Sequence, residues 1–301
     1  MTQSQIREIQ RSHSQKHRKN EKKVQKLINL VFAKQANIIS TFAGNHGIGA
    51  AISHITHLIT PQPIQDALRR SWIAVSRDYH DITLLTKKSE GKPGNTFLSD
   101  YARSHTAMQK VTDITDTTRE RLVATLQQAA TDKLHKRDVA KRIRESTGFS
   151  KNRSLLIART ETTMAANMGA YGSAMTSGLN LEKYWIATND NRTRDSHAEM
   201  LGSKPLPMDE LFEVGDSLMM FPGDPSGGPN EVCNCRCVLA FRPVQEQQTD
   251  DTPDEQQATQ GRRRRTSAKP KPSSEGDNSV EAFRTIIEGI VARINEGDNI
   301  I

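Results

Sequence analysis

The chain has 301 residues with a formal net charge of +7, enough length for one or two domains that each bury a core. Hydrophobic residues make up 35% and aromatic residues 5%, so the cores must rely on Leu, Ile, Met and Ala, and part of the length is expected to stay unpacked. The basic excess favours contact with phosphates or acidic protein surfaces. The first 30 residues lack the apolar core of a signal peptide.

Residues 1–34 are predicted to form a basic helix in which many cations accompany only Glu8 and Glu21. One interpretation is a solvated helical arm. The other is an arm that touches DNA or an acidic partner. The candidate contact residues are Lys16, Arg18, Lys19, Lys22, Lys23 and Lys26.

No charged residue occurs between Lys34 and Asp66 when histidine is neutral. Polar residues interrupt this stretch, which favours a buried or partner-facing helical segment over a membrane span. Pro61 and Pro63 break it, and a further helix carrying Trp72 is predicted over residues 64–85. A loop is predicted at residues 91–94.

The helical signals sharpen after Thr117, which forms a capping-box pattern with Glu120 and predicts a helix start. A short helix that ends at Gly148 follows. Ser150 is a suitable N-cap for a long helix over residues 151–177. The apolar stripe of that long helix includes Glu161.

After the long helix the pattern changes to strands at residues 183–188 and 232–241, with a turn at 189–191 and a loop rich in Pro and Gly at 221–229. The predicted fold class is α+β: N-terminal helices lead into a compact module in which a long helix packs on a small β-sheet. A disordered linker and a short terminal helix then follow.

Four parts of the chain are therefore predicted. They are a basic helical region at 1–110, the compact module at 111–243, a disordered linker at 244–279 and a short C-terminal helix at 280–301.

Several short motifs follow one another in the compact module. They are Arg159-Thr160-Glu161 on the long helix, Lys183-x-Trp185, Asp190-x-Arg192-x-Arg194 with His197, the loop at 222–225, and Asn234-Cys235-Arg236-Cys237. In this order they resemble the Mu F-like phage head morphogenesis family, over residues 111–243.

The resemblance implies a minor capsid protein of a tailed phage or prophage, made in the bacterial cytoplasm and present in the virion beside the portal. It would act in head morphogenesis and in DNA packaging or delivery. The implied partners are the portal protein or the major capsid protein, with nonspecific contact to double-stranded DNA. No membrane partner is expected.

Glu161 lies in an apolar stripe, and a buried carboxylate needs a cation or hydrogen-bond donors. We therefore predict a structural ion pair with an arginine of the sheet region, Arg192, Arg194 or Arg236, in preference to a catalytic acid or base.

The three cysteines lie within five residues, which is not a disulfide framework. On a straight strand, Cys233 and Cys237 would be about 13 Å apart end to end. Packed free cysteines beside a hydrogen-bonded histidine are the favoured interpretation, so no cofactor is expected. The alternative is a structural zinc ion held by His197, Cys235 and Cys237, with Asp190 or Asp195. The resemblance makes Cys233 the cysteine least expected to take part.

The charged turn around Asp190, Arg192, Arg194 and Asp195 is interpreted as a salt-bridged loop, with a DNA- or portal-binding surface as the alternative. The run Arg262, Arg263, Arg264 and Arg265 is either a solubilising linker or an electrostatic tether to DNA or capsid.

A rival hypothesis is a metal-dependent hydrolase or nuclease that uses Glu161, Asp190 and His197, because these residue types suit acid–base chemistry. No recognised catalytic motif is present, so a structural role is favoured over an enzymatic one.

Overall fold

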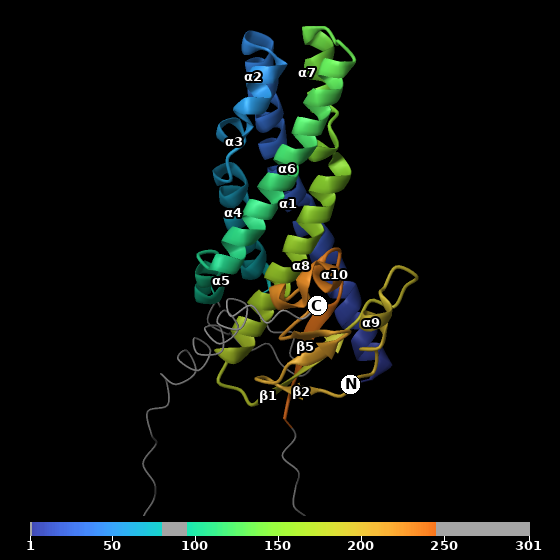
Figure 1. Cartoon of the computed structure of the whole chain (residues 1–301). Coiled ribbons are helices and arrows are strands. Elements are labelled where there is room, and N and C mark those ends of the chain that lie inside the picture. The colour runs from blue at the N-terminus through green and yellow to red at the C-terminus, as the bar shows by residue number, and fades with distance from the viewer. Residues whose placement is uncertain (1, 80–94, 245–301) are drawn as a thin grey trace, which may run out of the picture.

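The computed structural model describes residues 2–79 and 95–244. Several predictions lie outside these ranges: the end of the helix at 64–85, the loop at 91–94, the linker from residue 245 onward with Arg262 to Arg265, and the terminal helix. Within the described ranges the predicted α+β class is confirmed, because a helical bundle stands on a small antiparallel sheet (Figure 1).

The bundle consists of long helices that run side by side, with the sheet at one end (Figure 1). The helices are α1 (Gln3–His46), α2 (Ile48–Ser53), α3 (Ile55–Leu58), α4 (Gln62–Asp78), α5 (Asn95–Tyr101), α6 (His105–Thr131), α7 (Lys136–Arg144) and α8 (Lys151–Met175). The short helices α2 and α7 lie at the end opposite the sheet (Figure 1). A 3₁₀ turn, Thr147–Phe149, precedes α8.

Helix α1 is longer than predicted and is not a free arm. It begins at a capping box between Thr2 and Gln5 and ends at Gly47, whose φ of 88° stops the helix. One face is buried along its length, including Ile9, Ile28 and Ile39. The interpretation as a fully solvated arm is therefore wrong, because apolar residues at helical spacing draw this face against α4, α7 and α8.

The uncharged stretch is a buried helical segment, as predicted. It forms the end of α1 together with α2 and α3. Ile39, Ala51 and Ile59 pack with Leu122 and Ile143 of α6 and α7. In the part of the chain that the structure describes, no helix has both the length and the apolar character needed to cross a membrane.

The predicted helix start at Thr117 is wrong, because α6 runs without interruption from the N-cap Ser104. Val111 and Thr115 continue the buried face of Leu122 back toward the N-terminus. The hydroxyl of Thr118, the neighbour of Thr117, donates to the carbonyl of Ile114 at 2.8 Å, a bond that suits a helix interior. The predicted domain boundary after residue 110 also falls within α6.

Helix α8 begins where predicted, with the N–H of Arg153 donating to Ser150 Oγ at 3.2 Å. It is buried on nearly all sides rather than along one stripe, because it packs against α1, α4, α5 and the sheet. Gly169 permits the close approach of α4: a Cβ at this position would lie 2.8 Å from the Cβ of Ser76.

The sheet has the order β2-β1-β5, and all of its pairings are antiparallel. Its strands are β1 (Leu181–Ile186), β2 (Leu206–Pro207) and β5 (Val238–Pro243), and Lys183 pairs with Phe241. A separate hairpin joins β3 (Phe212–Val214) to β4 (Ser217–Met219). Short helical turns are α9 (Asp195–Ala198), η2 (Pro225–Gly227) and α10 (Gly228–Val232).

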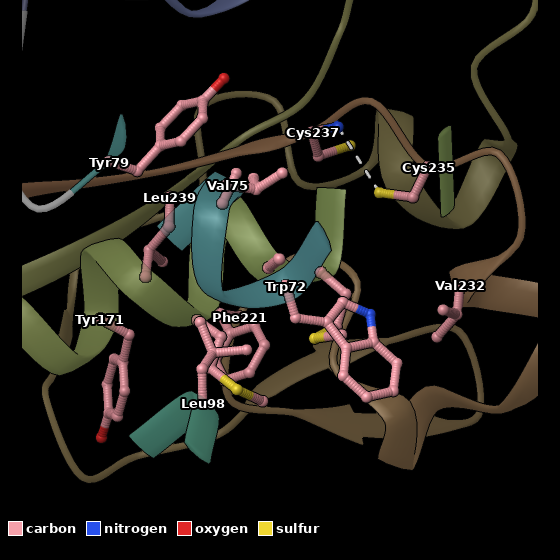
Figure 2. Packing of buried hydrophobic residues seen from close by; sticks show 14 of the residues in the cluster. Trp72, Val75, Tyr79, Leu98, Tyr171, Phe221, Val232, Cys235, Cys237 and Leu239 are labelled. Carbon is pink, nitrogen blue, oxygen red and sulfur yellow. Dashed lines mark hydrogen bonds between the residues drawn. The ribbon is translucent and has the colours of Figure 1, made fainter. Parts of the chain in front are cut away.

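The second predicted strand is too long at its start. Residues 228–232 form α10, and Asn234 then takes a φ of 57°, so the chain turns before β5 begins at Val238. The cysteine run therefore belongs to a turn. Around it, Figure 2 shows Trp72, Leu98 and Phe221 among the residues of the main core, which joins the sheet, the loops and the helices.

Candidate functional site

The turn before β5 brings two cysteines against one histidine. Cys237 Sγ lies 3.3 Å from His197 Nδ1, and Cys235 Sγ lies 3.8 Å from the same nitrogen. The three side chains supply one ligand atom each, and these atoms lie within 4.8 Å of one another. All three residues are buried. Figure 2 shows the two cysteines, with the bond from the Cys237 N–H to Cys235 Sγ drawn as a dashed line.

The opposite side of the imidazole faces a carboxylate. His197 Nε2 lies 3.0 Å from Glu231 Oε2, and that oxygen accepts a bond from Ser196 Oγ at 2.8 Å. The edge of the Trp185 ring packs against the imidazole. Glu231 was not predicted, and its position in a Pro- and Gly-rich stretch gave no signal. Only the helical turn α10 aims it at His197.

The two thiols influence each other's ionisation. The hydrogen bond between them lowers the pKa of Cys237 well below its usual value and raises the pKa of Cys235 well above it. Burial opposes ionisation of both groups. The pair therefore loses its first proton more readily than its second.

The predicted fourth ligands lie elsewhere. Asp190 accepts two bonds from Arg236, at 2.5 and 2.7 Å, and these bonds lower the pKa of its carboxyl group. Asp195 is exposed. Among the described residues, neither carboxylate belongs to the group of ligands around His197. As predicted, Cys233 also lies outside this group.

The charged turn is a salt-bridged loop, as predicted. Arg192 lies 3.6 Å from Asp190, and Arg194 donates to the carbonyl oxygen of Cys233. Arg236, which lies outside the turn, is bound to the same aspartate, so Asp190 pairs with both arginines. The alternative, a surface for DNA or the portal, has no observation in its favour here.

Glu161 forms a buried ion pair, but its predicted partner was wrong. Glu161 Oε1 lies 3.3 Å from Lys110 Nζ of α6, and Oε2 accepts a 2.8 Å bond from Trp72 Nε1 of α4. No arginine of the sheet region takes this role, because this face of α8 is turned toward the helices. Nothing in the sequence pattern distinguishes Lys110, 51 positions upstream of Glu161, from the arginines that follow the long helix.

The neighbouring residues of the Arg-Thr-Glu motif support the cysteine turn. Arg159 Nη1 donates to Asn234 Oδ1 at 3.3 Å and pairs with Glu21 of α1 through its other nitrogens. Thr160 Oγ1 accepts from the N–H of Asn234 at 3.1 Å. Thr163, one helical turn further, donates to the carbonyl of Cys235 at 2.6 Å. The helix therefore sets the position of the turn directly.

Asn167 connects three segments and was not predicted as a site residue. Its amide donates to the carbonyls of Pro222 and Cys237 at 2.8 and 3.1 Å, and its oxygen accepts from the N–H of Leu239 at 2.9 Å. Asp224 fixes the same loop by accepting from the N–H groups of Met220 and Ser226. Both are buried groups with satisfied hydrogen bonds, which is the pattern of structural residues.

Lys183 is fully buried and has no carboxylate as a direct hydrogen-bond partner among the contacts of the described chain. Its Nζ donates to the carbonyl of Met220 at 3.1 Å and lies 5.0 and 5.4 Å from the ring centres of Phe212 and Tyr171. Burial lowers its pKa from 10.5 to about 7. A substantial fraction of the Lys183 amine is therefore neutral near pH 7.

The proposed hydrolase residues do not share a site. Glu161 is bound by Lys110 and Trp72, Asp190 by Arg236, and His197 contacts the two cysteines and Glu231. Each residue belongs to a different set of contacts.

The predicted contact residues of α1 differ in exposure. Lys16 is partly buried, donates to the carbonyl of Asp78 and lies over the ring of Tyr79. Lys23 reaches the carboxylate of Asp78 at 3.7 Å. Exposed cations remain on the outer face of the helix. They are Arg18, Lys19, Lys22, Lys23 and Lys26.

Comparison with known proteins identifies the region that contains these motifs. Residues 120–240 match the model of the family described as Phage Mu protein F like protein. The chain is 33% identical over 106 residues to the minor head protein GP7 of Bacillus phage SPP1, which covers 34% of this chain and 34% of that protein.

A second relative has a different name. It is the NAD(+)--arginine ADP-ribosyltransferase EFV of Enterococcus faecalis (strain ATCC 700802 / V583), 36% identical over 104 residues, which covers 34% of this chain and 21% of that protein. The matched region therefore spans about a third of the minor head protein and about a fifth of the second relative. No solved structure matches the chain.

Proposed function

Because residues 120–240 match the model of the Phage Mu protein F like family, we propose that this protein is a minor head protein that acts in phage head morphogenesis. The observation that carries the proposal is the family match, together with the identity to a minor head protein over a third of the chain. The role is structural rather than enzymatic, since the acid–base residues of the domain are engaged in separate contacts.

The motifs of the domain support this role by building a rigid scaffold. Three consecutive residues of α8, Arg159, Thr160 and Glu161, contact Glu21 of α1, the cysteine turn, and Lys110 with Trp72, in that order. A scaffold of this kind presents surfaces to its neighbours in an assembly. The portal protein or the major capsid protein is the partner we propose.

The outer face of α1 provides a DNA contact in this proposal. Arg18, Lys22 and Lys26 follow one another at four-residue steps, which places them on one stripe of the helix. Like charges at this spacing repel each other by a few tenths of a kcal/mol per pair, roughly, and a polyanion relieves that cost. Nonspecific contact with packaged DNA follows from this charge pattern.

The head role is tested by deleting the gene from the phage genome that encodes the chain and by analysing purified particles. We expect mass spectrometry to detect the protein in wild-type heads, and we expect the deletion to reduce the yield of infectious particles. A protein absent from purified heads, with normal particles in the deletion strain, refutes the proposal. A pull-down with the portal protein and with the major capsid protein then identifies the partner.

The DNA contact is tested separately by the salt dependence of binding. Replacing Arg18, Lys22 and Lys26 by Gln is expected to lower the slope of log K against log salt by about 2–3, since each neutralised phosphate contributes about 0.9. The control replaces Lys136, Arg137 and Lys204, which changes the charge equally at exposed positions outside α1. An equal loss of affinity in the control would show that α1 is not the site of DNA contact.

A further inference from the structure

The group formed by His197, Cys235 and Cys237 has the geometry of an incomplete tetrahedral metal site. In a tetrahedral zinc site with Zn–S of about 2.3 Å and Zn–N of about 2.1 Å, neighbouring S and N atoms are about 3.6 Å apart and two sulfurs about 3.8 Å. The two S–N distances here are 3.3 and 3.8 Å. Since all three ligand atoms lie within 4.8 Å of one another, side-chain rotations that draw them slightly closer would place one ion at bonding distance from all three.

The contacts on the far side of the imidazole orient its ligand atom. A carboxylate at Nε2 favours the tautomer that carries its proton there, and Glu231 Oε2 lies 3.0 Å away. In the neutral ring this leaves an unprotonated lone pair on Nδ1, the nitrogen that lies 3.3 Å from Cys237 Sγ and 3.8 Å from Cys235 Sγ. Ser196 holds the carboxylate in place with a 2.8 Å bond. A carboxylate–histidine pair of this kind is the usual outer shell of a zinc-binding histidine.

The backbone around the cysteines also suits a bound cation. The N–H of Cys237 donates to Cys235 Sγ at 3.5 Å, and a donor of this kind stabilises negative charge on sulfur. The left-handed conformation of Asn234 makes the turn that brings the two sulfurs to the same side. Thr163 and Asn167 hold the turn by its carbonyls, so the ligands are positioned before any ion arrives.

We propose that His197 Nδ1, Cys235 Sγ and Cys237 Sγ bind one zinc ion, with a solvent molecule in the fourth position. Two sulfur ligands and one imidazole select zinc over magnesium or calcium, which prefer oxygen ligands. The ion would cross-link α9, which follows β1, to the segment that precedes β5. The proposal rests on the geometry of these three side chains and does not depend on the assignment to phage heads.

The first experiment measures the metal content of the full-length protein purified without chelator. About one zinc ion per chain is expected in the wild type. Cys237→Ser and Cys235→Ser are expected to lose it. The matched control is Cys233→Ser, which removes a thiol of the same turn from outside the ligand group and is expected to keep the zinc. Loss of zinc in the control equal to that in Cys237→Ser would overturn the proposal.

A ligand variant that fails to fold would lose zinc for a trivial reason, so the second experiment uses the folded wild type. The protein is stripped of metal and titrated with Co²⁺. Intense visible bands of tetrahedral cobalt and a thiolate charge-transfer band in the near ultraviolet are expected. Their absence, or a mass 2 Da lower that reveals a disulfide between Cys235 and Cys237, would overturn the proposal.

The third experiment tests the outer shell. Glu231→Gln leaves all three ligands in place, and zinc affinity measured by chelator competition is expected to fall about 10- to 100-fold. Glu199→Gln is the control, since Glu199 follows α9 and lies outside the ligand group. Equal affinities for Glu231→Gln and the wild type would show that Glu231 does not position a metal ligand.

Discussion

The buried pair of Glu161 and Lys110 provides a test of how the domain is held together. Glu161 is 3% exposed, and Lys110 Nζ is inaccessible to solvent although a fifth of its side chain is exposed. At 3.3 Å, the attraction between the charges is about 5 kcal/mol at an effective dielectric constant of about 20. Much of this attraction is offset by the cost of removing both charges from water.

Glu161→Gln removes the negative charge and leaves the ammonium buried without a counter-charge. Breaking one side of a buried pair typically costs about 3–5 kcal/mol. Glutamine can still accept the bond from Trp72 Nε1, so that contact contributes little to the loss. We therefore expect the free energy of unfolding to fall by about 3–4 kcal/mol.

The assay is urea denaturation of wild type, Glu161→Gln, Lys110→Met and the combined Lys110→Met/Glu161→Gln variant. The double variant buries no unpaired charge, so it is expected to be more stable than Glu161→Gln alone. If the free energy of unfolding of Glu161→Gln lies within about 0.5 kcal/mol of the wild-type value, the effect is no larger than that of a typical surface substitution. The ion pair would then not hold α8 against α6. An additive double variant leads to the same conclusion, because coupled charges do not give additive effects.

Three further predictions concern packing and pH. Gly169→Ala should destabilise the domain by about 1–3 kcal/mol in thermal denaturation, because the new Cβ would lie 2.8 Å from the Cβ of Ser76. The control is Gly44→Ala, which has open space around it in a helix and should be neutral or stabilising in the same measurement. Asn167→Leu leaves buried backbone groups of two segments without hydrogen-bond partners, so the free energy of unfolding measured in urea is expected to fall by more than about 3 kcal/mol. Near wild-type stability would refute the bridging role of Asn167. The pKa of Lys183 is about 7 in the folded chain and 10.5 in the reference state, so the unfolded chain binds more protons between these values and stability rises with pH across that window. Relative to Lys183→Met, the gain from pH 7 to 9.5 should be about 3 kcal/mol, and equal pH profiles in denaturant would contradict the prediction.

The sequence predicted the central helix well because its end signals are local. Ser150 caps α8 through the N–H of Arg153, and Gly178 takes a φ of 71° just after the helix ends. Where the decisive contacts were distant, the prediction failed. Thr117 and Glu120 satisfy the pattern of a helix start, yet Val111 and Thr115 continue the buried face past them, and burial outweighs a cap.

The candidate site was only partly predictable. The residue types at His197, Cys235 and Cys237 suggested a metal site, but a straight strand would have separated the sulfurs. The turn depends on Asn234, whose N–H is held by Thr160 and whose side chain is held by Arg159, both on a helix some 75 residues upstream. Strand propensity reflects only the local residue types, so it cannot predict a turn that depends on such distant contacts.

The contacts of α8 explain why motifs far apart in the sequence identify one domain. Arg159 and Thr160 hold the cysteine turn, Glu161 holds Lys110, and Asn167 holds the loop before α10 together with β5. Glu161 and Asn167 thus satisfy buried polar groups on other segments, and loss of either residue leaves its partners unpaired. A pattern of this kind specifies a fold, so it predicts which domain the chain contains but not which surface meets its partners. Partner choice must then depend on exposed positions such as the outer face of α1, which the motifs do not include.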